Sequence, residues 1–206
     1  MNKAKLPVKD WLWLIKLFEL EISARKGSQQ LRISYPTVLK TFHLIRHVII
    51  AHARDGDRLL NGEIEANVTF FKGRFKEENK VLGFGILERK GRVKVEALKD
   101  ANPETILNLT VNTVKTVRRG SIVYTDKFRS YDALMFCGYK HLRIGHGKRF
   151  SRRDVYINGL EGFWSYAKER FNRFHGVSKE KFPFYLKEME FRYNNRHKPI
   201  FNTLVQ

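Results

Sequence analysis

Apolar and polar positions follow two different periods along this chain of 206 residues. In the first 55 residues, apolar side chains recur every three or four positions, which predicts helices; they are Trp11, Leu14, Ile15, Phe18 and Ile22. Gly27 is expected to end the first helix, Ser28 to cap a short helical turn, and Ser34 to cap a longer helix with Pro36 in its first turn. This outline is typical of a helix-turn-helix, and equally of a helical bracket packed on the rest of the protein.

After a turn-like stretch at residues 55–58, the period changes to two, which is the pattern of a half-buried strand. Apolar and polar residues alternate there from Glu63 to Phe70. Strands are predicted over residues 62–71, 81–88, 92–98, 120–126 and 140–144. Helices are predicted over residues 103–117, around Tyr131, Leu134 and Met135, and over residues 155–174 and 178–194. This order favours an α/β fold with an RNase H-like mixed sheet flanked by helices over residues 56–206, preceded by a helical region over residues 1–55.

The charge balance points to a polyanionic partner. Forty Lys and Arg against 21 Asp and Glu give a net charge of +19, which is typical of nucleic-acid-binding proteins. A hydrophobic content of 42% is enough for a real core. The single Cys137 excludes a disulfide scaffold and a Cys-rich zinc site. No apolar run approaches the ~18 residues of a membrane span, and the first residues make a poor signal peptide, so we expect a cytoplasmic protein.

Candidate chemistry gathers in the second half of the chain. Asp126 ends a predicted strand, where ligand-binding side chains collect in α/β sheets, although an Asp there also serves as a helix cap. Asn158 and Glu161 are three residues apart on a predicted helix, so both are able to face one ion; by spacing alone they also fit a solvated helix shoulder. Residues 139–153 hold six Lys or Arg and no acid, which favours contact with a phosphodiester backbone. The candidate DNA-binding residues are Lys40, Arg46, Arg143, His146, Lys148, Arg149, Arg152, Arg153 and Lys168.

The chain also contains, in this order, the segments GEIEANVTFFKG, SIVYTDKFRSYDAL, HLRIGHGKRF, INGLEGFW and FRYNNR. Over about residues 8–196, it resembles the bacterial insertion-sequence transposases of the DDE superfamily. The likeness is greatest to the group whose catalytic set is Asp, Asp, Asn and Glu. This resemblance implies an RNase H-like core that cuts and rejoins DNA with two Mg²⁺ ions, for which Mn²⁺ is able to substitute. It also implies double-stranded DNA as partner, both transposon ends and target, and a homo-oligomer on that DNA.

Position by position, the resemblance makes Asp126 the second catalytic Asp, Asn158 the motif Asn and Glu161 the terminal Glu. Asn67 stands where the family has its first metal-binding Asp. An amide offers a neutral oxygen and no charge, so metal affinity should fall. Glu65, two residues earlier on the same strand face, is an alternative metal ligand.

Three functions therefore remain at the level of the sequence. The first is a DNA transposase impaired by Asn67, and the second is an inactive remnant that only binds DNA. The third, a general basic nucleic-acid-binding protein, does not account for motif blocks that occur in family order. The amino acid at position 67 is what separates the first two.

Overall fold

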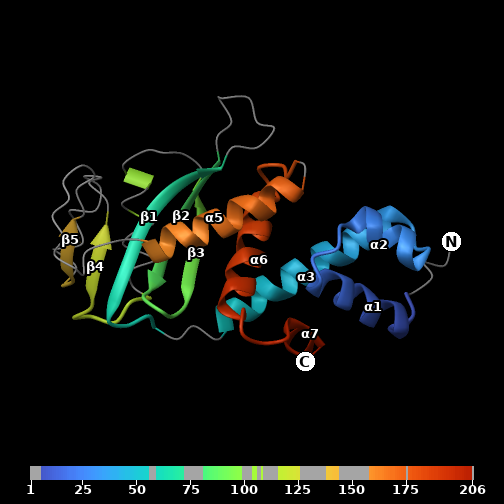
Figure 1. Cartoon of the computed structure of the whole chain (residues 1–206), viewed down its shortest axis with the longest axis horizontal. Helices are drawn as coiled ribbons and strands as arrows, with labels where there is room; N and C mark the ends of the chain where they lie inside the picture. Colours follow the sequence, from blue (N-terminus) through green and yellow to red (C-terminus); the bar gives the residue numbers. More distant parts are fainter. Residues whose placement is uncertain are drawn as a thin grey trace. The chain divides into compact units, whose positions relative to one another are not determined.

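The computed structural model describes residues 6–55, 59–71, 81–98, 104–105, 108, 116–125, 138–143, 158–174 and 176–205, and for residues 54 and 55 the backbone alone. The chain divides into two compact units. One consists of Met1–Asp55 with Asn195–Gln206, and the other of Gly56–Asn194. Figure 1 shows the helices of the first unit and the sheet of the second, which we describe in turn.

The first unit contains α1 (Val8–Glu19), α2 (Ala24–Leu31), α3 (Tyr35–Asp55) and α7 (Ile200–Val205). The expected stop at Gly27 and the expected cap at Ser28 are both wrong. The hydroxyl of Ser23 caps α2 by accepting the N–H of Lys26, and Gly27 lies buried inside that helix. A methyl group at Gly27 would meet Leu17 and Val38 at 3.5 Å, an ordinary van der Waals distance, so the glycine lies where α2 packs against α1 and α3.

The start of α3 agrees with the prediction. The carbonyl of Ser34 accepts the N–H groups of Thr37 and Val38, which opens the helix after the turn at residues 32–34. α7 was not predicted. The carboxylate of Glu19 on α1 accepts the N–H of Phe201 at 2.8 Å, which ties this short helix to α1.

The second unit is built on a five-stranded mixed sheet in the order β3-β2-β1-β4-β5. The strands are β1 (Glu63–Phe71), β2 (Val81–Glu88), β3 (Val93–Leu98), β4 (Ile122–Thr125) and β5 (Lys140–Arg143). β1, β2 and β3 pair antiparallel, whereas β1, β4 and β5 pair parallel. This topology confirms the predicted RNase H-like fold class, and each described strand lies within its predicted range.

The helices of this unit are α5 (Asn158–Arg173) and α6 (Phe182–Asn194). The helix predicted from residue 178 begins later, because residues 178–181 form a turn. Residues 104, 105 and 108 are helical, but Val117 pairs with Leu60 in a β-bridge, so the helix predicted through Val117 was too long. The helix predicted around residues 131–135 lies outside the described residues.

Strand alternation gives β1 two different faces. Ile64 and Ala66 enter one apolar cluster, together with Phe84, Ile86 and Val123. Phe71 belongs to a second cluster with Trp164 and Phe163 of α5, and Figure 1 shows α5 along the sheet. α6 covers the edge strand β3, where Glu190 accepts the N–H of Val95 and Asn194 bonds both polar backbone groups of Val93. These bonds satisfy an edge that would otherwise be open to pairing.

Candidate functional site

The site is built along the face of β1 that α5 covers. The N–H of Leu160 donates to Glu65 Oε2 at 2.8 Å, and Lys168 Nζ donates to Thr69 Oγ1 at 2.7 Å. α5 therefore runs in the direction of β1, with its first turn at Glu65. Asn67 lies between Glu65 and Thr69 in an uninterrupted ladder, so its side chain is on the same face of the strand.

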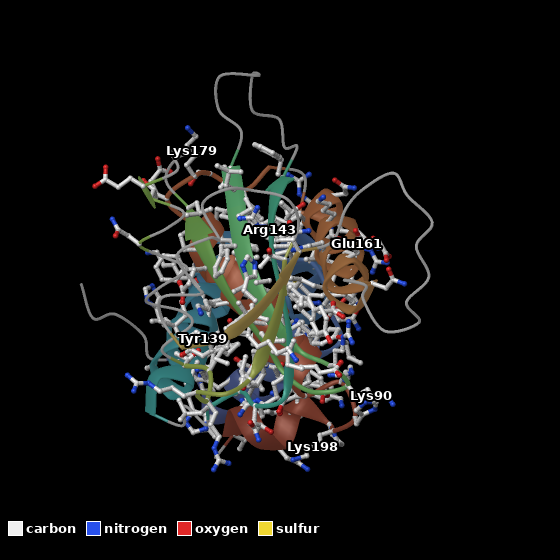
Figure 2. All side chains as sticks on the ribbon, turned by 90° about the vertical axis from the view of Figure 1, so that its left-hand side faces the viewer. Lys90, Tyr139, Arg143, Glu161, Lys179 and Lys198 are labelled. Carbon is white, nitrogen blue, oxygen red and sulfur yellow. The ribbon has the colours of Figure 1, made fainter. Side chains whose placement is uncertain are left out.

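Glu161 lies on the flank of α5 that leans toward this strand. It precedes Lys168 by seven residues, which is close to two helical turns, so the two side chains share one side of the helix. Because Lys168 reaches Thr69, that side is turned toward β1. Asn158 and Glu161 are both exposed to solvent. Figure 2 shows Glu161 on α5 and Arg143 on β5 toward one end of the sheet, and Tyr139 toward the other.

The described end of β4 lies next to the same part of β1. Thr125 pairs in parallel with Ala66, the residue directly before Asn67. The Thr125 hydroxyl shares a hydrogen bond of 2.7 Å with Nε2 of His141 on β5, and burial lowers the pKa of that imidazole. Asp126 follows Thr125 in the sequence and lies outside the described residues, so its place in the site stays a prediction.

Glu65 is buried, with 1% of its surface exposed. Oε2 accepts the N–H of Leu160, and Oε1 accepts Nε of Arg89 at 3.3 Å. Burial raises the pKa of the Glu65 carboxyl, while the hydrogen bond from Leu160 and the charge of Arg89 oppose that rise. Arg89 also pairs with Glu63, and its guanidinium carbon lies 4.1 Å from the ring centroid of Tyr124 on β4. Both oxygens of the alternative metal ligand are thus engaged with protein donors.

The candidate DNA-binding residues have different surroundings. Lys40 on α3 and Arg143 at the end of β5 are exposed. Arg46 is not a surface residue, since only 3% of it is exposed and its guanidinium carbon lies 5.4 Å from the ring centroid of Phe18. Its predicted contact with DNA is therefore wrong for this conformation. The remaining candidates in the basic segment, His146, Lys148, Arg149, Arg152 and Arg153, lie outside the described residues.

Sequence reasoning missed the contact of Glu65 with α5 and the role of Arg89, which lies in the hairpin turn between β2 and β3. The charge of Glu65 at an inward-facing position of β1 was the available signal. Within the part of the chain that the structure describes, no three His, Cys, Asp or Glu side chains gather as they would around a metal ion. Among the described helices, none combines the length and apolar character that a membrane crossing requires.

Comparison with known proteins identifies the family. The model of the ISXO2-like transposase domain matches residues 57–194, and the chain belongs to that family. This confirms the resemblance to transposases of the DDE superfamily. An uncharacterized transposase-like protein of Haemophilus influenzae (strain ATCC 51907 / DSM 11121 / KW20 / Rd) is 49% identical over 79 residues, which are 38% of this chain and 64% of that protein. The match thus spans less than two thirds of this curated relative.

Solved structures are also similar to this chain at low identity, and two of them serve as examples. A chain of the simian T-cell lymphotropic virus intasome in complex with the PP2A regulatory subunit B56 gamma is 14% identical, with a TM-score of 0.42 over 64% of this chain and 48% of that chain. The Mos1 transposase catalytic domain with Raltegravir and Mn is 10% identical, with a TM-score of 0.40 over 98% of this chain and 96% of that chain.

Proposed function

We propose that this chain is a DNA transposase whose metal-dependent strand cleavage is impaired by Asn67. The supporting observation is the meeting of β1, the end of β4 and the first turns of α5, with Asn67 on the face that α5 covers. β1 carries Asn67, the described end of β4 directly precedes Asp126, and α5 carries Glu161. A site assembled from separate elements is able to surround divalent ions with several oxygen ligands, and such ions would bind the phosphodiester.

The oxygen ligands at this site are of the type that a hard divalent cation prefers, but their total negative charge is low. Oxygens of Asn67 and Glu161, with Asp126, would hold Mg²⁺ or Mn²⁺, which prefer such ligands. When bound, a pair of divalent ions stabilises the attacking and leaving oxygens of an in-line displacement. The amide of Asn67 contributes a dipole where a carboxylate would offset the repulsion between the ions. Glu65 is poorly placed to replace it, because Leu160 and Arg89 occupy its oxygens.

Double-stranded DNA is the proposed partner, both as transposon ends and as target. The net charge of +19 supports this, as do the exposed Lys40 and Arg143. Lys168, whose Nζ lies at Thr69 on the Asn67 face, adds positive charge beside the proposed site. We propose that the chain works as a homo-oligomer on DNA. The division of labour between a DNA-binding helical region over residues 1–55 and a catalytic region over residues 56–206 is part of the same proposal.

The decisive experiment is the substitution Asn67→Asp. The unmodified chain should bind double-stranded DNA and nick it weakly or not at all with Mg²⁺, whereas Asn67→Asp should raise nicking by orders of magnitude, since a charged ligand adds several kcal/mol of transition-state stabilisation. The matched control is Asn61→Asp, which makes the same chemical change at an exposed residue just before β1. Adding Glu161→Gln to Asn67→Asp should abolish the gain.

Two other outcomes would change this conclusion. Strong Mg²⁺-dependent nicking by the unmodified chain would show that Asn67 does not impair the site. DNA binding without cleavage, even after Asn67→Asp, would favour the inactive remnant that only binds DNA.

A further inference from the structure

A buried carboxylate lies where four segments of the second unit meet. Glu65 comes from β1, and its partners are Leu160 in the first turn of α5 and Arg89 in the hairpin turn between β2 and β3. The fourth segment is β4, because the Arg89 guanidinium stacks on the ring of Tyr124. Such a cluster is costly to bury unless its members are paired, so its contacts hold the four segments together.

The hydrogen bond from the N–H of Leu160 to Glu65 satisfies a backbone donor at the start of α5. Leu160 is the third residue of the helix, and the first four N–H groups of a helix have no partner within it. The negative charge of Glu65 also lies at the positive end of the helix dipole. A methyl group at Gly159 would be 3.1 Å from Glu65 Oε2 and 2.8 Å from Leu87 Cδ2, so the first turn of α5 is tightly seated on the sheet.

We propose that Glu65 is a positioning residue, which fixes the first turn of α5 against β1 and thereby sets the position of Glu161 relative to Asn67. Arg89 holds the same carboxylate and extends the contact to β4, one residue before Thr125. The consequence for cleavage rests on the proposed function, whereas the anchoring of α5 does not.

The anchoring is tested by amide hydrogen exchange in the full chain, read at the N–H of Leu160. Glu65→Ala removes the acceptor and should speed exchange at Leu160 about tenfold, as expected for a lost helix cap. The matched control is Glu63→Gln, which changes the neighbouring carboxylate that pairs with Arg89. Exchange at Leu160 should stay within about twofold of the unmodified chain.

A second variant keeps the test decisive if Glu65→Ala does not fold. Glu65→Gln retains the shape and one acceptor oxygen but loses the charge, so exchange at Leu160 should rise several-fold. Unchanged exchange at Leu160 in a folded Glu65 variant would overturn the proposal. An equal effect of Glu63→Gln would also overturn it.

The role in the reaction is tested in the Asn67→Asp chain. There, Glu65→Gln should lower the nicking rate about tenfold and raise the Mg²⁺ concentration for half-maximal activity, as the loss of a residue that orients a metal ligand does. A rise in that Mg²⁺ concentration without faster exchange at Leu160 would make Glu65 a metal ligand and overturn the positioning role, and an unchanged nicking rate would overturn it as well. If Asn67→Asp is itself inactive, the proposed function fails, while the exchange at Leu160 still decides the anchoring.

Discussion

Replacing Gly85 by alanine should destabilise the sheet–helix unit, because α5 packs directly on the backbone of β2. A Cβ at Gly85 would lie 2.6 Å from Cζ2 of Trp164 and 3.1 Å from Cδ1 of Leu160. Carbon atoms in contact prefer about 3.5–4.0 Å, so α5 or the indole must move by roughly 1 Å. Trp164 is 3% exposed and packs against the rings of Phe71 and Phe163, which leaves the indole little room to turn.

Overpacking of this kind costs about 1–3 kcal/mol. For a chain of this length, each kcal/mol lowers the Tm by roughly 2–4 °C. The assay is urea and thermal unfolding followed by circular dichroism. Gly162→Ala on the same helix is the control, because a methyl group there meets no atom within 4 Å. Alanine in a helix is about 0.5–1 kcal/mol more favourable than glycine, so this variant should be more stable than the unmodified chain.

Both substitutions replace glycine by alanine, and they should change the free energy of unfolding in opposite directions. Gly85→Ala with unchanged stability would refute the close seating of α5 on β2. Destabilisation by Gly162→Ala would show that the effect of added methyl groups here has a different origin.

Two further predictions concern charge. The affinity for double-stranded DNA should fall steeply with salt, by about 10³–10⁵ between 50 and 200 mM if 6–10 phosphates are contacted, and a flat salt dependence measured by filter binding would contradict the assigned partner. Burial raises the pKa of Glu190 above 4.5, while Lys187 and the N–H of Val95 oppose that rise. The folded state thus binds a proton more tightly than the unfolded state, so its stability should fall as pH rises above 4.5. Glu190→Gln should lack this part of the pH dependence in urea midpoints from pH 4 to 8, and a constant difference from the unmodified chain would contradict the assignment.

The sheet was predictable because each strand carries its own burial pattern. β1 alternates along its length, and β2 is an almost continuous apolar run, as a central strand requires. The end of the first helix, which comes before Gly27, was not predictable from local propensity. Gly27 lies inside α2, where the helix packs against Leu17 and Val38, while the chain leaves α1 near Glu21, which has a left-handed φ of 57°.

The candidate site was predictable only in part, because its residues come from separate segments of the chain. Helical spacing placed Asn158 and Glu161 on one helix, but it gave no information on which flank leans toward β1. The bond between Glu65 and Leu160 joins residues 95 positions apart, and local patterns do not report such contacts. Arg46 shows the converse error, because its charge suggested DNA contact while its helix turns it toward Phe18.

The position of α5 and the charge of the proposed metal site depend on different residues. α5 is seated by Gly85, Gly159 and Glu65, and none of these is Asn67. Asn67→Asp exchanges an amide for a carboxylate of nearly the same shape, so it should leave that packing intact and change mainly the charge on the α5 face of β1. Lys168, two positions along that face at Thr69, brings positive charge toward the new carboxylate. A gain of cleavage after this one substitution would therefore report on the charge of the site alone, with the scaffold unchanged.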